Sequence, residues 1–174
     1  TMSAATTANV TVSISTSGTG TEGTDYGTIS DITISAGSTT GTASFTPTDD
    51  STYEGDETAI VAISGVSGGS ASESGTQTTT ITITENESAP TVSFATSGTT
   101  VYDNGSNITL TATSTQIADE AITIAIGTSG TATEGTDYAT ISDITIAAGD
   151  TTGTATFNPT EDTSNEGTES ATIS

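Results

Sequence analysis

The sequence predicts an all-β protein made of tandem antiparallel β-sandwiches, Ig-like in kind, with about seven strands in a complete repeat. The composition is the first observation: 46 Thr, 24 Ser and 19 Gly residues favour strands and turns over helices. The second is that apolar residues alternate with Thr at a period of two, as in strands with one buried face. The third is that a long segment of the chain occurs twice, which indicates two copies of one domain.

The repeat has an offset of 112 residues. Residues 1–62 align without gaps on residues 113–174, and 35 of these 62 positions are identical. We expect a first repeat over residues 1–87 that lacks its first two strands, and a second over residues 88–174 that lacks its last strand. Both chain ends then fall within a repeat. This predicts either an excerpt from a longer array or a subunit whose missing strands come from neighbouring chains by strand addition.

Each expected strand is a short run in which Ile, Val, Leu or Phe alternates with Thr or Ser. The apolar side chains should face the core and the Thr side chains should face water. In the second repeat, two strands that the first repeat lacks precede a series matching the first. In chain order the expected strands are 10–14, 32–34, 40–45, 57–63 and 78–84, then 91–94, 108–112 and 121–126, followed by the counterparts of the first series. Residues 85–90 form the expected linker, and Pro90 restricts the entry to the next strand.

The charge of the chain is entirely negative. Its net charge is −22, and it contains no Lys, Arg or His. Nucleic acid and anionic membrane surfaces are therefore repelled, and cations are the natural partners. Low hydrophobicity with high net charge is also typical of disorder, but the regular strand periodicity argues against that interpretation.

The absence of several residue types argues against other classes of function. Without Cys there are no disulfides or thiolate metal sites, and no apolar run of 18 residues predicts membrane insertion. Without His, Cys or Lys, a Ser or Thr nucleophile has no ordinary base. Paired carboxylates could hydrolyse a glycoside, but four Tyr and three Phe residues spread over two repeats do not indicate a sugar cleft. We expect no enzyme activity.

Two acidic segments, residues 48–57 and 160–169, keep four acids at matching positions. Carboxylates this close must be dispersed in water or share a metal ion, and several hard oxygen ligands suit Ca²⁺. An EF-hand is excluded, because a loop begun at Asp50 has Val61 at position twelve, where a Glu is required. A solvated acidic loop stays open as the alternative. Repulsion of order 1 kcal/mol per close pair in water favours an ion.

The order of these motifs resembles the Calx-β domain, the calcium-binding sandwich of many large bacterial surface proteins. The resemblance covers essentially the whole chain. It is carried by Gly23-Thr24-Asp25-Tyr26, the Ala36-Gly37 turn, Asp49-Asp50 followed by Tyr53-Glu54-Gly55-Asp56-Glu57, and the closing segment from Ile81 to Glu87. It implies Ca²⁺ ligands at one end of each sandwich. Those implied are Asp25, Asp49, Asp50, Glu54, Glu57, Glu85 and Glu87 in the first copy, and Asp103, Asp137, Glu161, Asp162, Glu166 and Glu169 in the second.

The resemblance and the repeat together predict a calcium-stabilised structural repeat. We expect an extracellular rod or filament segment of a bacterial surface or adhesin protein, located at the cell surface, with neighbouring repeats and Ca²⁺ as partners. One alternative is an adhesive module that binds carbohydrate or another surface through its Thr-rich faces. Another is a calcium sensor, although the complete absence of basic residues suits bulk extracellular use better.

Overall fold

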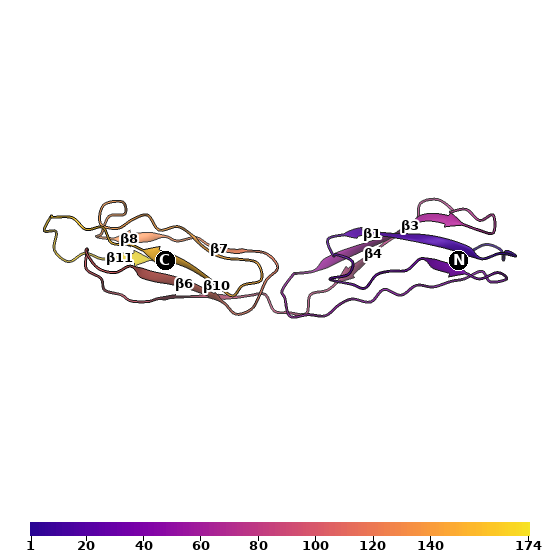
Figure 1. Ribbon diagram of the computed structural model, residues 1–174, viewed down its shortest axis with the longest axis horizontal. Helices are drawn as coiled ribbons and strands as arrows, with labels where there is room; N and C mark the ends of the chain where they lie inside the picture. The colour runs from indigo at the N-terminus through magenta and orange to yellow at the C-terminus, as the bar shows by residue number, and fades with distance from the viewer. The chain divides into compact units, whose positions relative to one another are not determined.

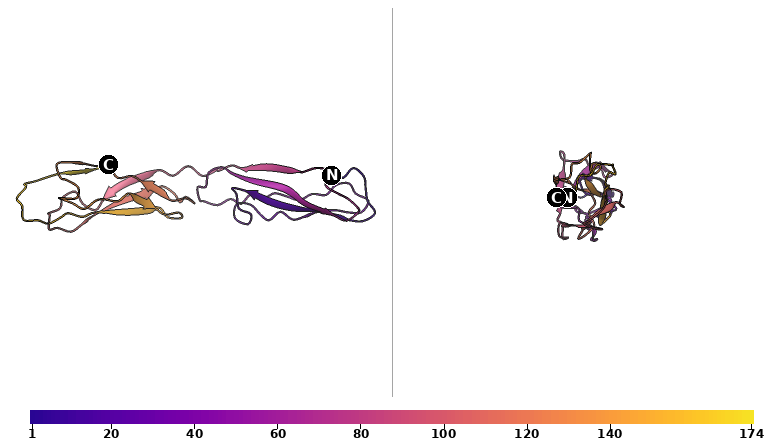
Figure 2. Two further views of the ribbon diagram at one scale, coloured as in Figure 1. Left: turned by 90° about the horizontal axis from the view of Figure 1, so that it is seen from above. Right: turned by 90° about the vertical axis from the view of Figure 1, so that its left-hand side faces the viewer.

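The computed structural model describes residues 1–174. The chain forms two compact units, one of residues 1–50 and 55–86 and the other of residues 51–54 and 87–174. Neither unit contains a helix, and every paired strand is antiparallel (Figure 1, Figure 2). No helix therefore meets the length and hydropathy needed to cross a membrane. The predicted all-β antiparallel sandwich fold is confirmed.

The first unit is built on one four-stranded sheet with the order β2-β1-β3-β4. Its strands are β1 (Val10–Gly18), β2 (Ile32–Ile34), β3 (Glu57–Ser67) and β4 (Thr78–Ile83). Strands β1, β3 and β4 lie next to one another in Figure 1. Along β4 the Thr side chains are exposed whereas Ile81 and Ile83 are half-buried, so the predicted alternation holds there.

The second unit divides its strands among three smaller sheets. One has the order β10-β6-β5, and the other two pair β7 with β9 and β8 with β11. The core contains Leu110, Ala112, Ile144 and Ile146, all fully buried at 0% exposure. The strands are β5 (Val92–Thr96), β6 (Ile108–Ser114), β7 (Ile122–Ile124), β8 (Thr128–Gly130), β9 (Ile144–Ile146), β10 (Thr152–Phe157) and β11 (Ala171–Ile173).

Two strand predictions were wrong in part. Residues 40–45 form no strand, although their counterpart β10 does. Strand β10 pairs with β6, and the first unit places no strand beside residues 40–45. Val92 and Phe94, expected to face the core, are 40% and 44% exposed. Strand β5 pairs only with β6 at a sheet edge, and its side chains are left in solvent.

Candidate metal centre

A tight loop in the first unit holds Asp25. Gly23 has a φ of +92°, a left-handed conformation that glycine adopts without steric cost, and its N–H donates to the Tyr26 carbonyl at 2.7 Å. The Tyr26 ring is 1% exposed and stacks on Phe45 with centroids 5.0 Å apart. A buried aromatic ring therefore fixes the position of the residue directly before it, which is Asp25.

The second copy repeats this loop around Asp137. The Gly135 N–H donates to the Tyr138 carbonyl at 2.7 Å, and the buried Tyr138 ring stacks on Phe157 at 4.8 Å. In both loops the N–H of the residue four positions earlier donates to the Asp Oδ2 atom. These distances are 2.5 Å from Thr21 to Asp25 and 2.6 Å from Thr133 to Asp137. Each Asp carboxylate is therefore oriented by its own backbone before any ligand binds.

Two Glu side chains join the Asp in each copy. The groups are Asp25 with Glu54 and Glu57, and Asp137 with Glu166 and Glu169. Within each group, one carboxylate oxygen from every residue lies within 4.8 Å of the others. Two oxygens bound to one Ca²⁺ at 2.3 to 2.6 Å lie at most about 5 Å apart. The spacing and the all-oxygen chemistry of both clusters therefore fit a calcium ion.

The electrostatics of the second cluster show that its acids repel one another. The pKa of Glu166 is raised above its ordinary value, first by the charge of Asp162 and then by Asp137, with a smaller contribution from Asp103. Desolvation raises the pKa of Glu169 most, followed by the charge of Asp137. Two further predicted residues, Asp103 and Asp162, are thus close enough for their charges to act on the cluster.

In the first copy, the closing segment lies against the acidic loop. Glu85 accepts a hydrogen bond from the Gly55 N–H through Oε2 at 2.9 Å, and its own N–H donates to Asp56 Oδ1 at 2.9 Å. The Asn86 side chain donates to Asp49 Oδ1 at 3.0 Å. The roles of Asp56 and Asn86 were missed by sequence reasoning. Nothing in the repeat signals Asp56, because its counterpart is Thr168.

The remaining predicted ligands are outside the two three-carboxylate groups. They are Asp49, Asp50, Glu85 and Glu87 in the first copy and Asp103, Glu161 and Asp162 in the second. Their assignment as ligands stays a prediction. The six acids of the two clusters form three pairs at the 112-residue offset, which are Asp25 with Asp137, Glu54 with Glu166 and Glu57 with Glu169. The same three positions therefore converge in both copies.

Comparison with known protein families agrees with this geometry. The family model of the Calx-β domain matches residues 1–87 and again residues 85–174. The chain belongs to the Calx-β domain family. Calx-β repeats are calcium-binding β-sandwich domains with structural and binding roles, and the paired carboxylate clusters suit that class. No curated protein matches the chain in sequence.

The raised pKa values predict how the stability of the metal-free Calx-β chain depends on pH. Because Glu166 and Glu169 have a folded-state pKa above the ordinary value of 4.5, the folded state binds protons more tightly than the unfolded state. Stability should therefore fall as the pH rises through the window just above 4.5, and the full penalty should remain at neutral pH. Thermal melts in EDTA between about pH 4.5 and 7 measure this.

The E166Q/E169Q double variant is the control for that pH series. It removes the two shifted groups and leaves the other acids, so its melting temperature should depend less on pH than that of the wild type. Equal slopes for the two proteins would contradict the link between the cluster and the pH dependence.

Proposed function

We propose that the chain is a calcium-stabilised structural repeat from an extracellular rod or filament of a bacterial surface or adhesin protein. The observation that carries the proposal is the duplicated cluster. The same three acidic positions converge within 4.8 Å in both copies of a chain that has no basic side chain to neutralise them. Duplication of a whole domain is typical of repeat arrays that act as spacers, rather than of a single adhesive domain.

Calcium would act by cancelling repulsion at each cluster. Asp25 and Asp137 supply oxygens that the backbone has already oriented, and the Glu side chains from the following loop complete each group. Bound Ca²⁺ supplies the positive charge that the protein lacks. The loop of residues 48–57 and the closing segment from Glu85 are already linked by hydrogen bonds, so an ion held there would also stiffen the start of the linker.

Small-angle X-ray scattering tests whether the ion stiffens the chain. We expect scattering curves recorded with Ca²⁺ to show less conformational spread than curves recorded with EDTA. Mg²⁺ should have a weaker effect, because it prefers a smaller octahedral site and loses its water reluctantly. The matched control is an E54Q/E57Q/E166Q/E169Q variant, which keeps side-chain size but should not respond to Ca²⁺.

Superimposable wild-type curves with Ca²⁺ and EDTA would contradict the proposed role. Calcium titration calorimetry on the same samples separates the two steps. Calcium binding without a change in scattering would contradict the mechanical role. Absence of calcium binding would contradict the metal site itself.

A further inference from the structure

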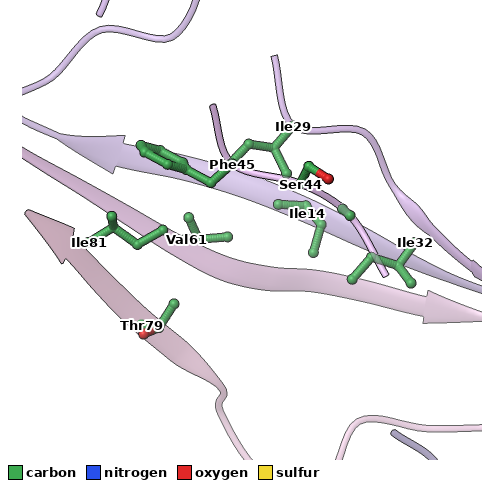
Figure 3. A pocket seen from close by; sticks show the side chains of 9 residues that line it. Ile14, Ile29, Ile32, Ser44, Phe45, Val61, Thr79 and Ile81 are labelled. Atoms are coloured by element: carbon green, nitrogen blue, oxygen red, sulfur yellow. The ribbon is translucent and has the colours of Figure 1, made fainter. Parts of the chain in front are cut away.

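The first unit contains an apolar cavity that offers no reactive group. Its volume is about 160 Å³, and Figure 3 shows Ile14, Val61 and Ile81 of the sheet on one side and Ile29 and Phe45 on the other. The remaining lining residues are Ile32, Ala43, Ser44 and Thr79. None of these side chains is charged, and a hydroxyl without a neighbouring base is a weak nucleophile. A reactive pair of residues lies instead in an exposed turn of the second unit.

The loop between β5 and β6 contains the sequence Tyr102-Asp103-Asn104-Gly105. The Gly105 N–H donates to the Tyr102 carbonyl at 2.8 Å, which closes a four-residue β-turn. The Asn104 N–H donates to Asp103 Oδ1 at 2.9 Å. All residues from Tyr102 to Asn107 are exposed. The turn is therefore held by hydrogen bonds that water can replace, and no buried side chain opposes its opening.

Gly105 leaves the Asn104 side chain open to attack by the backbone. Because glycine has no Cβ, the Gly105 nitrogen can approach Asn104 Cγ without steric hindrance once the turn hydrogen bond opens. The turn itself favours glycine here, since a Cβ on residue 105 would lie only 2.8 Å from the Tyr102 carbonyl oxygen. The feature that shapes the turn thus also removes the side chain that would protect Asn104.

The other five Asn residues lack this arrangement. Each is followed by a residue with a side chain, and these residues are Val10, Glu87, Ile108, Pro159 and Glu166. A side chain hinders the approach of the following nitrogen, and proline has no amide hydrogen to lose. Hydrogen bonds also hold two of these Asn side chains. Asn9 Oδ1 accepts from the Ala36 N–H at 2.9 Å, and the Asn86 side chain donates to Asp49 at 3.0 Å.

We propose that Asn104 is a site of spontaneous deamidation. The Gly105 nitrogen loses its proton to solvent hydroxide and attacks Asn104 Cγ, which forms a cyclic succinimide. The Cγ–Nδ2 bond breaks, and the side-chain nitrogen takes a proton from water and leaves as ammonia. Water then opens the ring at either carbonyl. Opening at Cγ gives Asp, whereas opening at the backbone carbonyl gives isoaspartate, in which the main chain runs through the former side chain.

Either product adds one carboxylate next to Asp103, so the net charge becomes one unit more negative than −22. The charge of Asp103 already contributes to the raised pKa of Glu166. A second acid beside Asp103 therefore adds to the negative charge around the second carboxylate cluster. The reaction needs no metal ion, and so it does not depend on the proposed function.

Incubation of the full chain in warm, mildly alkaline buffer tests this site. It continues until a free peptide of residues 102–107, kept in the same buffer, has been converted. Isoelectric focusing measures the charge of the chain. Cleavage after Glu residues then releases residues 88–120, and tandem mass spectrometry of this peptide locates the change. We expect an acidic shift of a single charge, with Asn104 converted to the acid and Asn107 still an amide.

N104Q and N107Q are matched variants in the same loop. N104Q should lose the acidic shift, because Gln would have to close a larger ring, which forms far more slowly. N107Q should become acidic as the wild type does. Both positions are exposed, so both variants should melt like the wild type. The proposal is overturned if Asn104 is still an amide when the free peptide has been converted. It is also overturned if Asn107 reacts as fast as Asn104, or if N104Q acidifies like the wild type.

Discussion

Calcium is expected to raise the melting temperature of the chain by roughly 10 °C over its value in EDTA, and the D25N/D137N double variant is expected to lose this rise. An ion present at 100 times its dissociation constant stabilises the folded state by about 2.7 kcal/mol per site. Each kcal/mol shifts the melting temperature of a domain of this size by roughly 4 to 8 °C. Weak extracellular calcium sites reach that excess only at about 10 mM Ca²⁺ or above, so the melts should span a concentration series.

The same variant distinguishes an ion site from a solvated acidic surface. Asn retains an oxygen that can accept the Thr21 and Thr133 N–H groups, but it removes the charge that repels the neighbouring Glu side chains. In EDTA the variant should therefore melt at or above the wild-type temperature, whereas in Ca²⁺ it should melt below. A variant that melts above the wild type in both conditions would contradict the metal site.

The matched control for this experiment is the E73Q/E120Q double variant, which removes two charges from outside the clusters. It should show the full calcium response. Loss of the response in this variant as well would mean that Ca²⁺ acts by general screening of the net charge.

Replacing Tyr138 by Ala is expected to destabilise the second unit by about 3 to 5 kcal/mol, the usual cost of deleting a buried aromatic side chain. The ring is 1% exposed and stacks on Phe157 within a core whose other large side chains are Leu and Ile. Because small domains are stable by only about 5 to 15 kcal/mol, much of the stability of this unit should be lost. Urea unfolding followed by circular dichroism measures the change.

Tyr102 provides the control for this substitution. It is 79% exposed, so Y102A should change the unfolding free energy by no more than about 0.5 kcal/mol. A small loss in Y138A, comparable with that in Y102A, would contradict the anchoring role of the buried ring.

Calcium binding at the second cluster provides a second test of the role of Tyr138. Since this ring positions Asp137, Y138A should also remove calcium binding at the second cluster and leave the first cluster able to bind. Titration calorimetry measures the number of calcium ions bound by the wild type and by Y138A. An unchanged number of bound ions would show that Asp137 is held independently of the ring.

Much of the candidate site could be predicted from the sequence because the motifs that resemble the Calx-β domain occur in both copies. Asp25, Glu54 and Glu57 recur at the offset of 112 as Asp137, Glu166 and Glu169, and both sets converge in the structure. The hydrogen bonds from Asn86 to Asp49 and from Glu85 to Asp56 could not be predicted. They join residues roughly 30 positions or more apart, and only the fold brings such segments together.

The sequence alone determined the strand-rich class, the duplication and the residues able to form each strand, because side-chain alternation is a local property of an extended backbone. It did not decide which of these segments become strands. Residues 40–45 and 152–157 differ at one position, yet only the second segment is a strand. A strand requires a hydrogen-bonded partner, and only the tertiary structure, through β6, supplies one to residues 152–157.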